Sequence, residues 1–281
     1  MNEILAQTLA DISNLRDISS LSLVELHVCS PFVVVKLNDG SVGSAGNYDV
    51  QNKTPGYDSA RAKSDFLRRV ADDPLLFETS LQDKSLAALS LRTAILSALS
   101  QPLLNSDVLC NVGLFHRPAE YQEGLLESYL REGDTAVLIG YGGGLYELCS
   151  SHKVSRLYVC DLLFSKQRHR DLAWRRLRGI SKDLSRISLT HRASEVPFER
   201  AGLCFITGSA LCNGTMEELL RLARHCREVI VQGPSCSLLP LELFRRGRPW
   251  FSRPERPPWN WTPRNGATSP ICRDSKWSKG D

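Results

Sequence analysis

The sequence contains no uninterrupted apolar run that approaches the roughly 18–20 residues a membrane-spanning helix requires. The best candidate, Phe32 to Val35, is only as long as a strand. The first 17 residues include three acidic side chains and lack a basic stretch followed by an apolar core, which argues against a secretory signal. We therefore expect a cytoplasmic protein that has no membrane partner.

Extremes of composition are also missing. The 281 residues are 42% hydrophobic and 23% charged. These values lie close to the globular average and exclude collagen-like, coiled-coil and fully disordered chains. At roughly 100–200 residues per domain, the length allows one or two domains.

The cysteines and histidines lack the spacings of metal, redox or catalytic motifs. The nine cysteines are an odd number and form no C-x-x-C pair, and the six histidines are scattered. Without a secretory signal, a disulfide framework is not expected. We expect no structural metal, and no Ser-His-Asp or Cys-His pair can be proposed from the spacing.

Charge is not spread over the whole chain. Seven basic and three acidic residues within 248–281 account for the entire net charge of +4, which leaves 28 residues of each sign in the other 247. A neutral body gives no support to nucleic-acid binding. The basic helix expected over 166–179 is interpreted as the solvated outer face of a sheet-covering helix.

Four regions differ in pattern. Residues 1–105 mix helix and strand, and residues 106–133 are a connecting segment with a helix expected over 119–131. Residues 134–247 alternate short apolar runs with helical patterns, which predicts a Rossmann-like parallel sheet covered on both faces. Residues 248–281 form a tail rich in proline, tryptophan and arginine.

The first region is predicted to be a small α+β unit. Two apolar runs, 21–28 and 32–37, precede the hairpin signal Asn38-Asp39-Gly40. The return strand over 41–48 is rich in small residues, where another backbone or a ligand can approach closely. Asn47 and Tyr48 at its end are candidate catalytic residues, although packing at a strand end explains Tyr48 equally well.

A glycine loop is the most informative motif. The buried strand 136–139 leads into Gly140, Tyr141, Gly142, Gly143 and Gly144, and a helix follows at once. Glycine takes a positive φ at little cost and admits a ligand close to the backbone, and we expect both at Gly142. Asp161 ends the next strand, 21 positions after Gly140, where a carboxylate can accept hydrogen bonds from ribose hydroxyls. The motif predicts a nucleoside site.

The identity of the nucleoside is only partly decided. The dinucleotide motif G-x-G-x-x-G/A needs a small residue at position 145, and this chain has Leu145. The G-x-G-x-G spacing instead resembles the first motif of S-adenosylmethionine (SAM) enzymes. These enzymes often have an acid two residues before the first glycine, where this chain has Leu138. SAM is favoured, and NAD(P) or a tight turn without a ligand remain the alternatives.

Two further loops follow predicted strands at the same sheet edge. Capping and turn chemistry alone can explain each of them, but three loops at the carboxyl edge of one parallel sheet favour a pocket. We expect this pocket to lie between the two units, with the first unit as its lid. The candidate residues are Thr207, Gly208, Ser209 and Asn213 in one loop and Gly233, Pro234 and Ser235 in the other.

Residues 206–247 resemble the second domain of the Rossmann-like proteins known as the heavy-metal chelation family. The shared pattern is a Thr-Gly strand end, an Asn-Gly-Thr helix start and a Gly-Pro-Ser loop. Residues 30–48 resemble the first domain of the same proteins, which folds like the N-terminal domain of enolase. The resemblance covers most of 1–247 and implies that fold. Two departures are a glycine loop richer in glycine than usual and a tail in place of a further strand and helix.

These observations predict a two-domain α/β protein that uses SAM on a small molecule. Methyl or other alkyl transfer and intramolecular cyclisation or elimination of SAM both remain open, so a transferase and a lyase are equally compatible. The alternative is a non-enzymatic protein that chelates a metal or metallophore, and an NAD(P)-binding oxidoreductase is less favoured. A homodimer is possible, and no nucleic-acid partner is expected.

Overall fold

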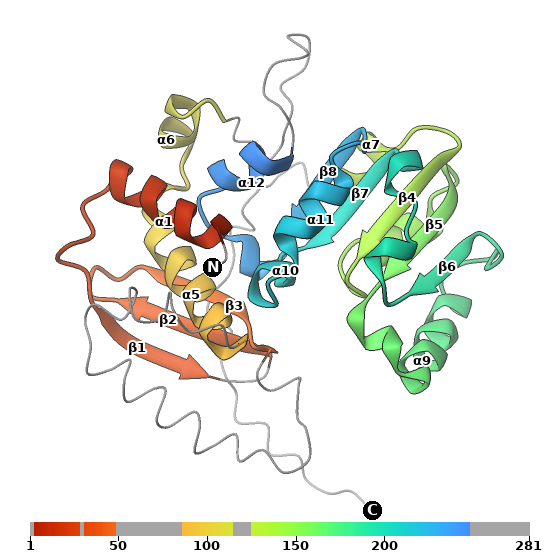
Figure 1. Cartoon of the computed structure of the whole chain (residues 1–281), viewed down its shortest axis with the longest axis horizontal. Helices are drawn as coiled ribbons and strands as arrows, with labels where there is room; N and C mark the ends of the chain where they lie inside the picture. The colour runs from red at the N-terminus through yellow and green to blue at the C-terminus, as the bar shows by residue number, and fades with distance from the viewer. Residues whose placement is uncertain (1–2, 29–30, 49–85, 115–124, 248–281) are drawn as a thin grey trace, which may run out of the picture.

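A computed structural model describes residues 3–28, 31–48, 86–114 and 125–247, which form two adjoining α/β units (Figure 1). The expected tail 248–281 lies outside the described residues, as do the first residues of the helix expected over 119–131. The mixed α/β class predicted from the sequence is confirmed, with one small antiparallel sheet and one five-stranded parallel sheet.

The first unit is a three-stranded meander covered by helices. Its sheet has the order β1-β2-β3, and the Asn38-Asp39-Gly40 turn joins the last two strands, with Gly40 at φ +87°. Helix α5 packs directly on β3. This close packing requires glycine at position 43, since an added Cβ would lie only 2.2 Å from the Ala94 carbonyl oxygen. The elements are α1 (Glu3–Leu15), β1 (Leu23–Val28), β2 (Phe32–Leu37), β3 (Val42–Gly46) and α5 (Leu86–Ser100).

Helix α5 and the turn that follows it are more apolar than inspection of the sequence suggested. Residues 86–103 pass the length and hydropathy test for a membrane span, although serine, threonine and arginine interrupt the run. Within the protein, 78% of this window is buried against the first sheet and the second unit. Burial explains its composition as that of a core helix, so it is weak evidence for a membrane span.

The second unit is a parallel sheet of order β6-β5-β4-β7-β8. The chain moves from β4 outward to β6 and then returns to the other side of β4 with β7, so the strand order reverses between β4 and β7. The strands are β4 (Asp134–Ile139), β5 (Val154–Cys160), β6 (Ile187–Thr190), β7 (Leu203–Thr207) and β8 (Glu228–Gln232). The main covering helices are α8 (Leu145–Ser150), α9 (Gln167–Arg178) and α11 (Met216–Ala223).

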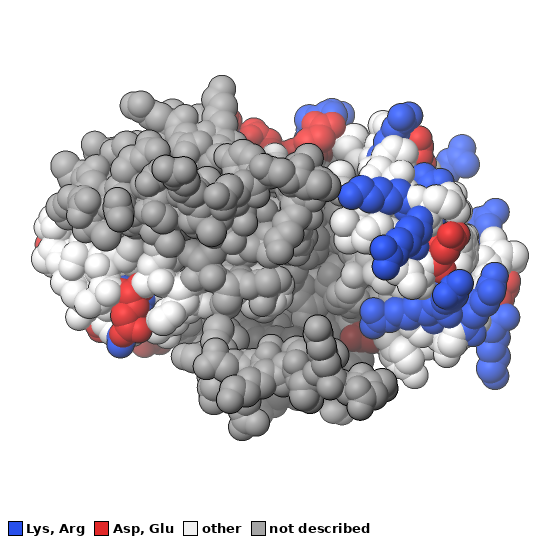
Figure 2. All heavy atoms as spheres, turned by 90° about the horizontal axis from the view of Figure 1, so that it is seen from below, with Lys and Arg blue, Asp and Glu red and all other residues white. Residues whose placement is uncertain are grey.

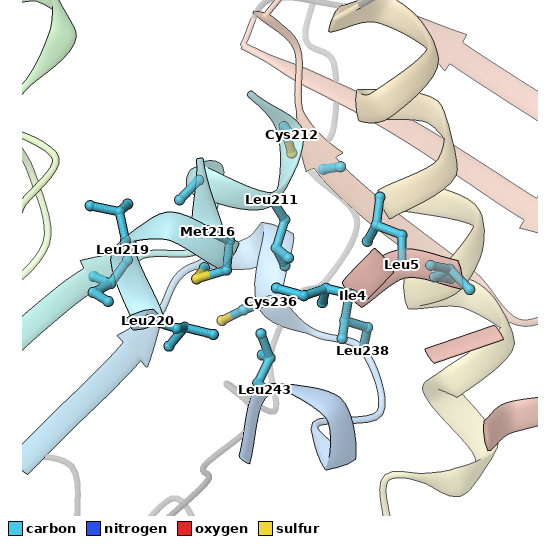
Figure 3. Close-up of a cluster of buried hydrophobic side chains, with 14 of the residues drawn as sticks. Ile4, Leu5, Leu211, Cys212, Met216, Leu219, Leu220, Cys236, Leu238 and Leu243 are labelled. Atoms are coloured by element: carbon cyan, nitrogen blue, oxygen red, sulfur yellow. The ribbon is translucent and has the colours of Figure 1, made fainter. Parts of the chain in front are cut away.

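Alternate strand residues point into two different cores. Leu138 and Phe205 belong to the core beneath α8 and α9, whereas Val137 and Ile206 belong to a core that also contains residues of α1 and α5. Figure 3 shows part of this shared core, including Ile4 and Leu238, which come from opposite ends of the described chain. The second of these cores is therefore shared by the two sheets.

Several short helices were not predicted. They span between one and two turns, too few residues for an apolar period to be recognised in sequence. Within the described part of the helix expected over 119–131, α7 (Leu125–Tyr129) is helical. The helices that were not predicted are α6 (Ser106–Asn111), α10 (Ser209–Cys212), α12 (Leu241–Gly247), η3 (Leu162–Ser165) and η6 (Pro234–Cys236).

Candidate functional site

The candidate site lies along the carboxyl edge of the parallel sheet. All five strands run in the same direction, so the residues that follow their last positions share that edge. Ligands of open α/β sheets bind where the strand order reverses, which here is between β4 and β7. The residues that directly follow the strands are Gly140, Asp161, His191, Gly208 and Gly233.

Glycine is required for packing at both ends of the glycine loop. Gly140 has φ +93°, and a Cβ there would lie 2.5 Å from the Thr207 Cγ2 atom. Gly144 has φ +76°, and its Cβ would lie 3.0 Å from the Leu126 Cδ1 atom. A side chain at either position would be strained and would push against a neighbouring element. These two glycines fix the shape of the loop.

The middle of the loop differs from the sequence-based expectation. Gly142 does not have a positive φ, so the expectation of one at this position is wrong. A Cβ at Gly142 would meet nothing within 4 Å, whereas one at Gly143 would contact the Phe205 ring at 3.7 Å. The positive φ values lie at the two ends of the loop, and the backbone at Gly142 has open space beside it.

Asp161 holds the loop against β5. One carboxylate oxygen accepts a hydrogen bond from the Tyr141 backbone N–H at 2.6 Å, and the other accepts one from the Leu163 N–H at 2.8 Å. The carboxylate is half-buried, and each oxygen retains a second lone pair. The structure therefore places the strand-end acid beside the glycine loop, as the 21-residue spacing predicted.

The Tyr141 side chain is directed toward α9. Its hydroxyl donates to the Ala173 carbonyl at 3.4 Å, its ring packs edge-on against Phe164, and the Arg176 guanidinium lies 5.6 Å from the ring centre. These contacts occupy the side chain, so the backbone of Tyr141 is the part that borders the candidate site.

The loop after β7 is organised by its own hydroxyl and amide groups. The Thr207 hydroxyl donates to the Ser209 Oγ atom at 3.3 Å. The Asn213 Oδ1 atom accepts hydrogen bonds from the Thr215 N–H at 3.1 Å and from the Thr215 hydroxyl at 2.7 Å. Thr215 is the residue that precedes α11, but its side chain does not cap the helix.

The first unit reaches this edge through the end of β3. The Tyr48 hydroxyl is in hydrogen-bond contact with the side chains of Ser209 and Asn213. The Gly46 N–H donates to the Ser235 Oγ atom at 2.9 Å. These contacts bring Tyr48 together with three of the residues proposed from the loops after β7 and β8.

Tyr48 remains protonated in this environment. Burial raises the pKa of its hydroxyl above the ordinary value of 10.0, and the nearby Cys212 and Asp161 raise it further. The hydrogen bonds with Ser209 and Asn213 offset part of this rise. Because the Asp161 charge is felt at Tyr48, the two halves of the candidate site are electrostatically connected.

The other residues predicted for the site take part in packing, backbone hydrogen bonds and turns. Asn47 is buried, and its N–H donates to the Pro31 carbonyl at 2.8 Å. Gly208 packs closely against the turn after β8, where an added Cβ would lie 2.8 Å from the Cys236 nitrogen. Gly233 has φ +127°, and Pro234 begins the 3-10 turn η6.

Sequence reasoning overlooked the residues at the end of β6. An Arg170 Nη2 atom lies 3.3 Å from the Nδ1 atom of His191, and Thr190 donates its hydroxyl proton to Glu195. Asp161 is adjacent, since its N–H donates to the Thr190 carbonyl at 3.0 Å. The available signal was the position of His191 directly after the short stretch Ile187–Thr190, which forms β6.

The described residues do not fit a metal centre. They contain no group of three or more His, Cys, Asp or Glu side chains that could hold an ion. Burial raises the pKa of Cys149 to about 11 and the pKa values of Cys160 and Cys236 to about 12, which favours the thiol over the metal-binding thiolate. In the described residues the candidate metal donors are therefore dispersed, and these three cysteines are held as thiols.

Part of the chain is similar to a known protein family. Residues 125–248 match the model of the DUF364 family, described as "Putative heavy-metal chelation". No curated protein matches the chain. The family match overlaps the 206–247 resemblance found in the sequence.

Two solved structures of DUF364 proteins with unknown function are similar in fold. The protein from Desulfitobacterium hafniense has a TM-score of 0.56 at 17% identity and covers 88% of this chain and 85% of its own. The protein from Pyrococcus horikoshii has a TM-score of 0.53, also at 17% identity, and covers 85% of this chain and 82% of its own. These similarities show the two-unit fold.

Proposed function

We propose that this protein is an enzyme that binds SAM at the carboxyl ends of β4 and β5 and uses it on a small molecule. The observation that carries the proposal is the hydrogen bond from the Tyr141 N–H to the Asp161 carboxylate. It joins the glycine loop and the strand-end acid in one arrangement, next to the open backbone at Gly142. A nucleoside needs this combination of close backbone approach and a ribose-binding carboxylate.

The geometry favours a nucleoside without a diphosphate. Leu145 is buried in the core, where the dinucleotide motif requires a small residue for close packing of helix on strand. Helix α8 has only six residues, so it offers a weaker dipole for a diphosphate than the long helix of a dinucleotide fold. An NAD(P) cofactor is therefore less well supported than SAM.

The protein's own contribution would be binding, orientation and exclusion of water. The glycine loop and Asp161 would hold the ligand. SAM supplies electrophilic carbons next to its sulfonium when it is bound. The protonated Tyr48 hydroxyl and the Ser209 hydroxyl would orient the acceptor by hydrogen bonding, because they lie where the first unit meets the end of β7. Alkyl transfer and intramolecular reaction of SAM are both compatible with these roles.

Calorimetry on the full chain tests the ligand. We expect SAM to bind wild-type protein and, at 100 times its Kd, to stabilise it by about 2.7 kcal/mol. Asp161→Ala removes the ribose acceptor and the hold on Tyr141, so SAM affinity should fall about tenfold or more. Asp171→Ala is the matched control, because Asp171 is exposed on α9 and bonded to Gln167.

The outcome is informative only if Asp161→Ala keeps its fold, which circular dichroism would check. A wild-type chain that does not bind SAM would overturn the proposal. Tyr48→Phe separates binding from reaction, since we expect it to leave SAM affinity unchanged and to lower turnover once an acceptor is found.

Metal chelation is the competing function that the family description suggests. Elemental analysis of protein purified without an affinity tag distinguishes the two. One equivalent of zinc or nickel per chain would favour chelation over the SAM proposal. We expect less than stoichiometric metal, because burial holds Cys149, Cys160 and Cys236 as thiols.

A further inference from the structure

The outward side of α9 carries an unusual concentration of positive charge. Residues 166–186 include eight basic and two acidic side chains. Six of the basic residues are exposed. One of them, Arg176, lies over the Tyr141 ring, and the other five define what we call the α9 basic surface. Figure 2 shows many blue and few red side chains on the end of the molecule where α9 lies. The five residues are Lys166, Arg168, Arg175, Arg178 and Lys182.

These five cations have no carboxylate partner among the described residues. The two acids of the segment are engaged locally, Asp171 with Gln167 and Asp183 with Ser185. Several arginines elsewhere do have carboxylate partners, as in the pairs Arg227–Asp134 and Arg245–Asp11. The α9 basic surface is therefore available to an anionic partner.

Exposed leucines lie beside these cations. Leu162 is 55% exposed, Leu163 44% and Leu172 51%. Leu172 has arginines at positions −4, +3 and +4, which are its neighbours on a helix surface. The two other leucines belong to η3, which packs against α9. The partner must therefore accept aliphatic side chains among positive charges.

We propose that the α9 basic surface docks on an anionic phospholipid membrane. Lipid phosphates and carboxylates would pair with the arginines and lysines, and the leucines would enter the apolar boundary beneath the headgroups. The charge complementarity is strong, because each basic residue near an anionic leaflet adds to the attraction. The proposal is independent of the SAM site.

Other occupants fit the same surface less well. A nucleic acid would pair with the arginines, but single strands are bound mainly through stacking on aromatic rings, and the exposed apolar side chains here are leucines. Residues 248–281 of the same chain carry a net positive charge, which does not complement this surface. No membrane partner was expected from the sequence, because periodicity and composition do not show that these leucines are exposed and these cations unpaired.

Vesicle co-sedimentation of the full chain tests the proposal. We expect binding to phosphatidylcholine vesicles only when they contain phosphatidylserine, and release at high salt. The triple variant Arg168→Glu, Arg175→Glu, Arg178→Glu should lose about tenfold or more in affinity. The matched control is Arg200→Glu, Arg221→Glu, Arg224→Glu, which makes the same change in net charge on η5 (Phe198–Arg200) and α11 and at the residue after α11.

The affinity of the control for vesicles should stay within about threefold of wild type. At physiological ionic strength, salt screens charges that lie far from the docking surface. Leu172→Ser should weaken vesicle binding severalfold and leave SAM binding unchanged. Thermal melts would confirm that all variants fold. A wild-type chain that ignores phosphatidylserine, or a control that loses as much affinity as the α9 variant, would overturn the proposal.

A labelled single-stranded and a duplex oligonucleotide provide the competing arm. Nucleic-acid binding that depends on Arg168, Arg175 and Arg178 but not on Leu172, together with no preference for phosphatidylserine, would assign the surface to nucleic acid instead.

Discussion

Gly140 and Gly142 are two residues apart, yet a methyl group would have different consequences at the two positions. At Gly140 the backbone has a positive φ, and the added carbon would meet the Thr207 side chain at 2.5 Å. At Gly142 the φ is not positive, and the added carbon would face open space. Only the first glycine is required by the fold, so any requirement at the second would come from a ligand.

Alanine substitutions separate these two requirements. We expect Gly140→Ala to lower the free energy of unfolding by about 1–3 kcal/mol, from backbone strain and the contact with Thr207. Gly142→Ala should change it by less than about 1 kcal/mol, while weakening SAM binding by crowding the open backbone. Urea denaturation and calorimetry measure the two quantities. If both variants bind SAM like wild type, the loop is only a turn.

At the scale of elements, one ion pair ties the beginnings of two strands together. Asp134 at the start of β4 accepts hydrogen bonds from both terminal nitrogens of Arg227, which precedes β8, at 3.1 and 2.6 Å. Gly202, before β7, lies between them, since its Cβ would be 2.3 Å from an Asp134 oxygen. Burial raises the pKa of Asp134, but Arg227 and the Arg131 N–H lower it by more, so the net pKa is below the usual 3.8.

This lowered pKa predicts how stability depends on acidity. The folded pKa lies below the unfolded value, so the Asp134 carboxylate stabilises the fold above about pH 4 and loses this contribution as the pH falls through the folded pKa. Asp134→Asn should cost about 1–3 kcal/mol at pH 7 and less at pH 3. Urea denaturation at the two pH values measures the difference, and an equal loss at both would contradict the assignment.

At the scale of the whole molecule, α12 links the two units. Its Glu242 is buried and pairs with Arg245 and Arg246 of the same helix. Arg245 also pairs with Asp11 of α1, and Arg246 pairs with Glu3 of α1 and with Glu217 of α11. The end of the described chain thus fastens the first helix to the second unit. Because the hydrophobic core is shared as well, removal of the first unit would expose core residues of the second unit.

Glu242→Gln tests this link. It leaves both arginines without their most buried partner, and we expect a loss of about 1–3 kcal/mol in the free energy of unfolding, below the cost of breaking a fully buried pair because the arginines are partly exposed. Arg221→Ala on α11 breaks a pair in which both side chains are more than half exposed, and should cost less than about 1 kcal/mol. Equal losses in the two variants would show that α12 does not fasten the units.

The sequence by itself determined the elements whose patterns are local. The β2–β3 hairpin follows from its Asn-Asp-Gly turn, and strands β4 to β8 follow from short apolar runs bounded by turn residues. The proximity of Asp161 to the glycine loop follows from parallel topology, because consecutive strand ends meet at one edge.

Only the tertiary structure decided which side chains meet across the units. Tyr48 and Ser209 are 161 positions apart, and no local pattern brings them together. Their contact depends on the packing of α5 and α12, which holds the first sheet against the second unit. The sequence also did not reveal the open backbone at Gly142, the unpaired cations of the α9 basic surface or the exposed leucines beside them. Exposure and pairing depend on what surrounds a residue in space, whereas sequence periodicity reports only on the element that contains it.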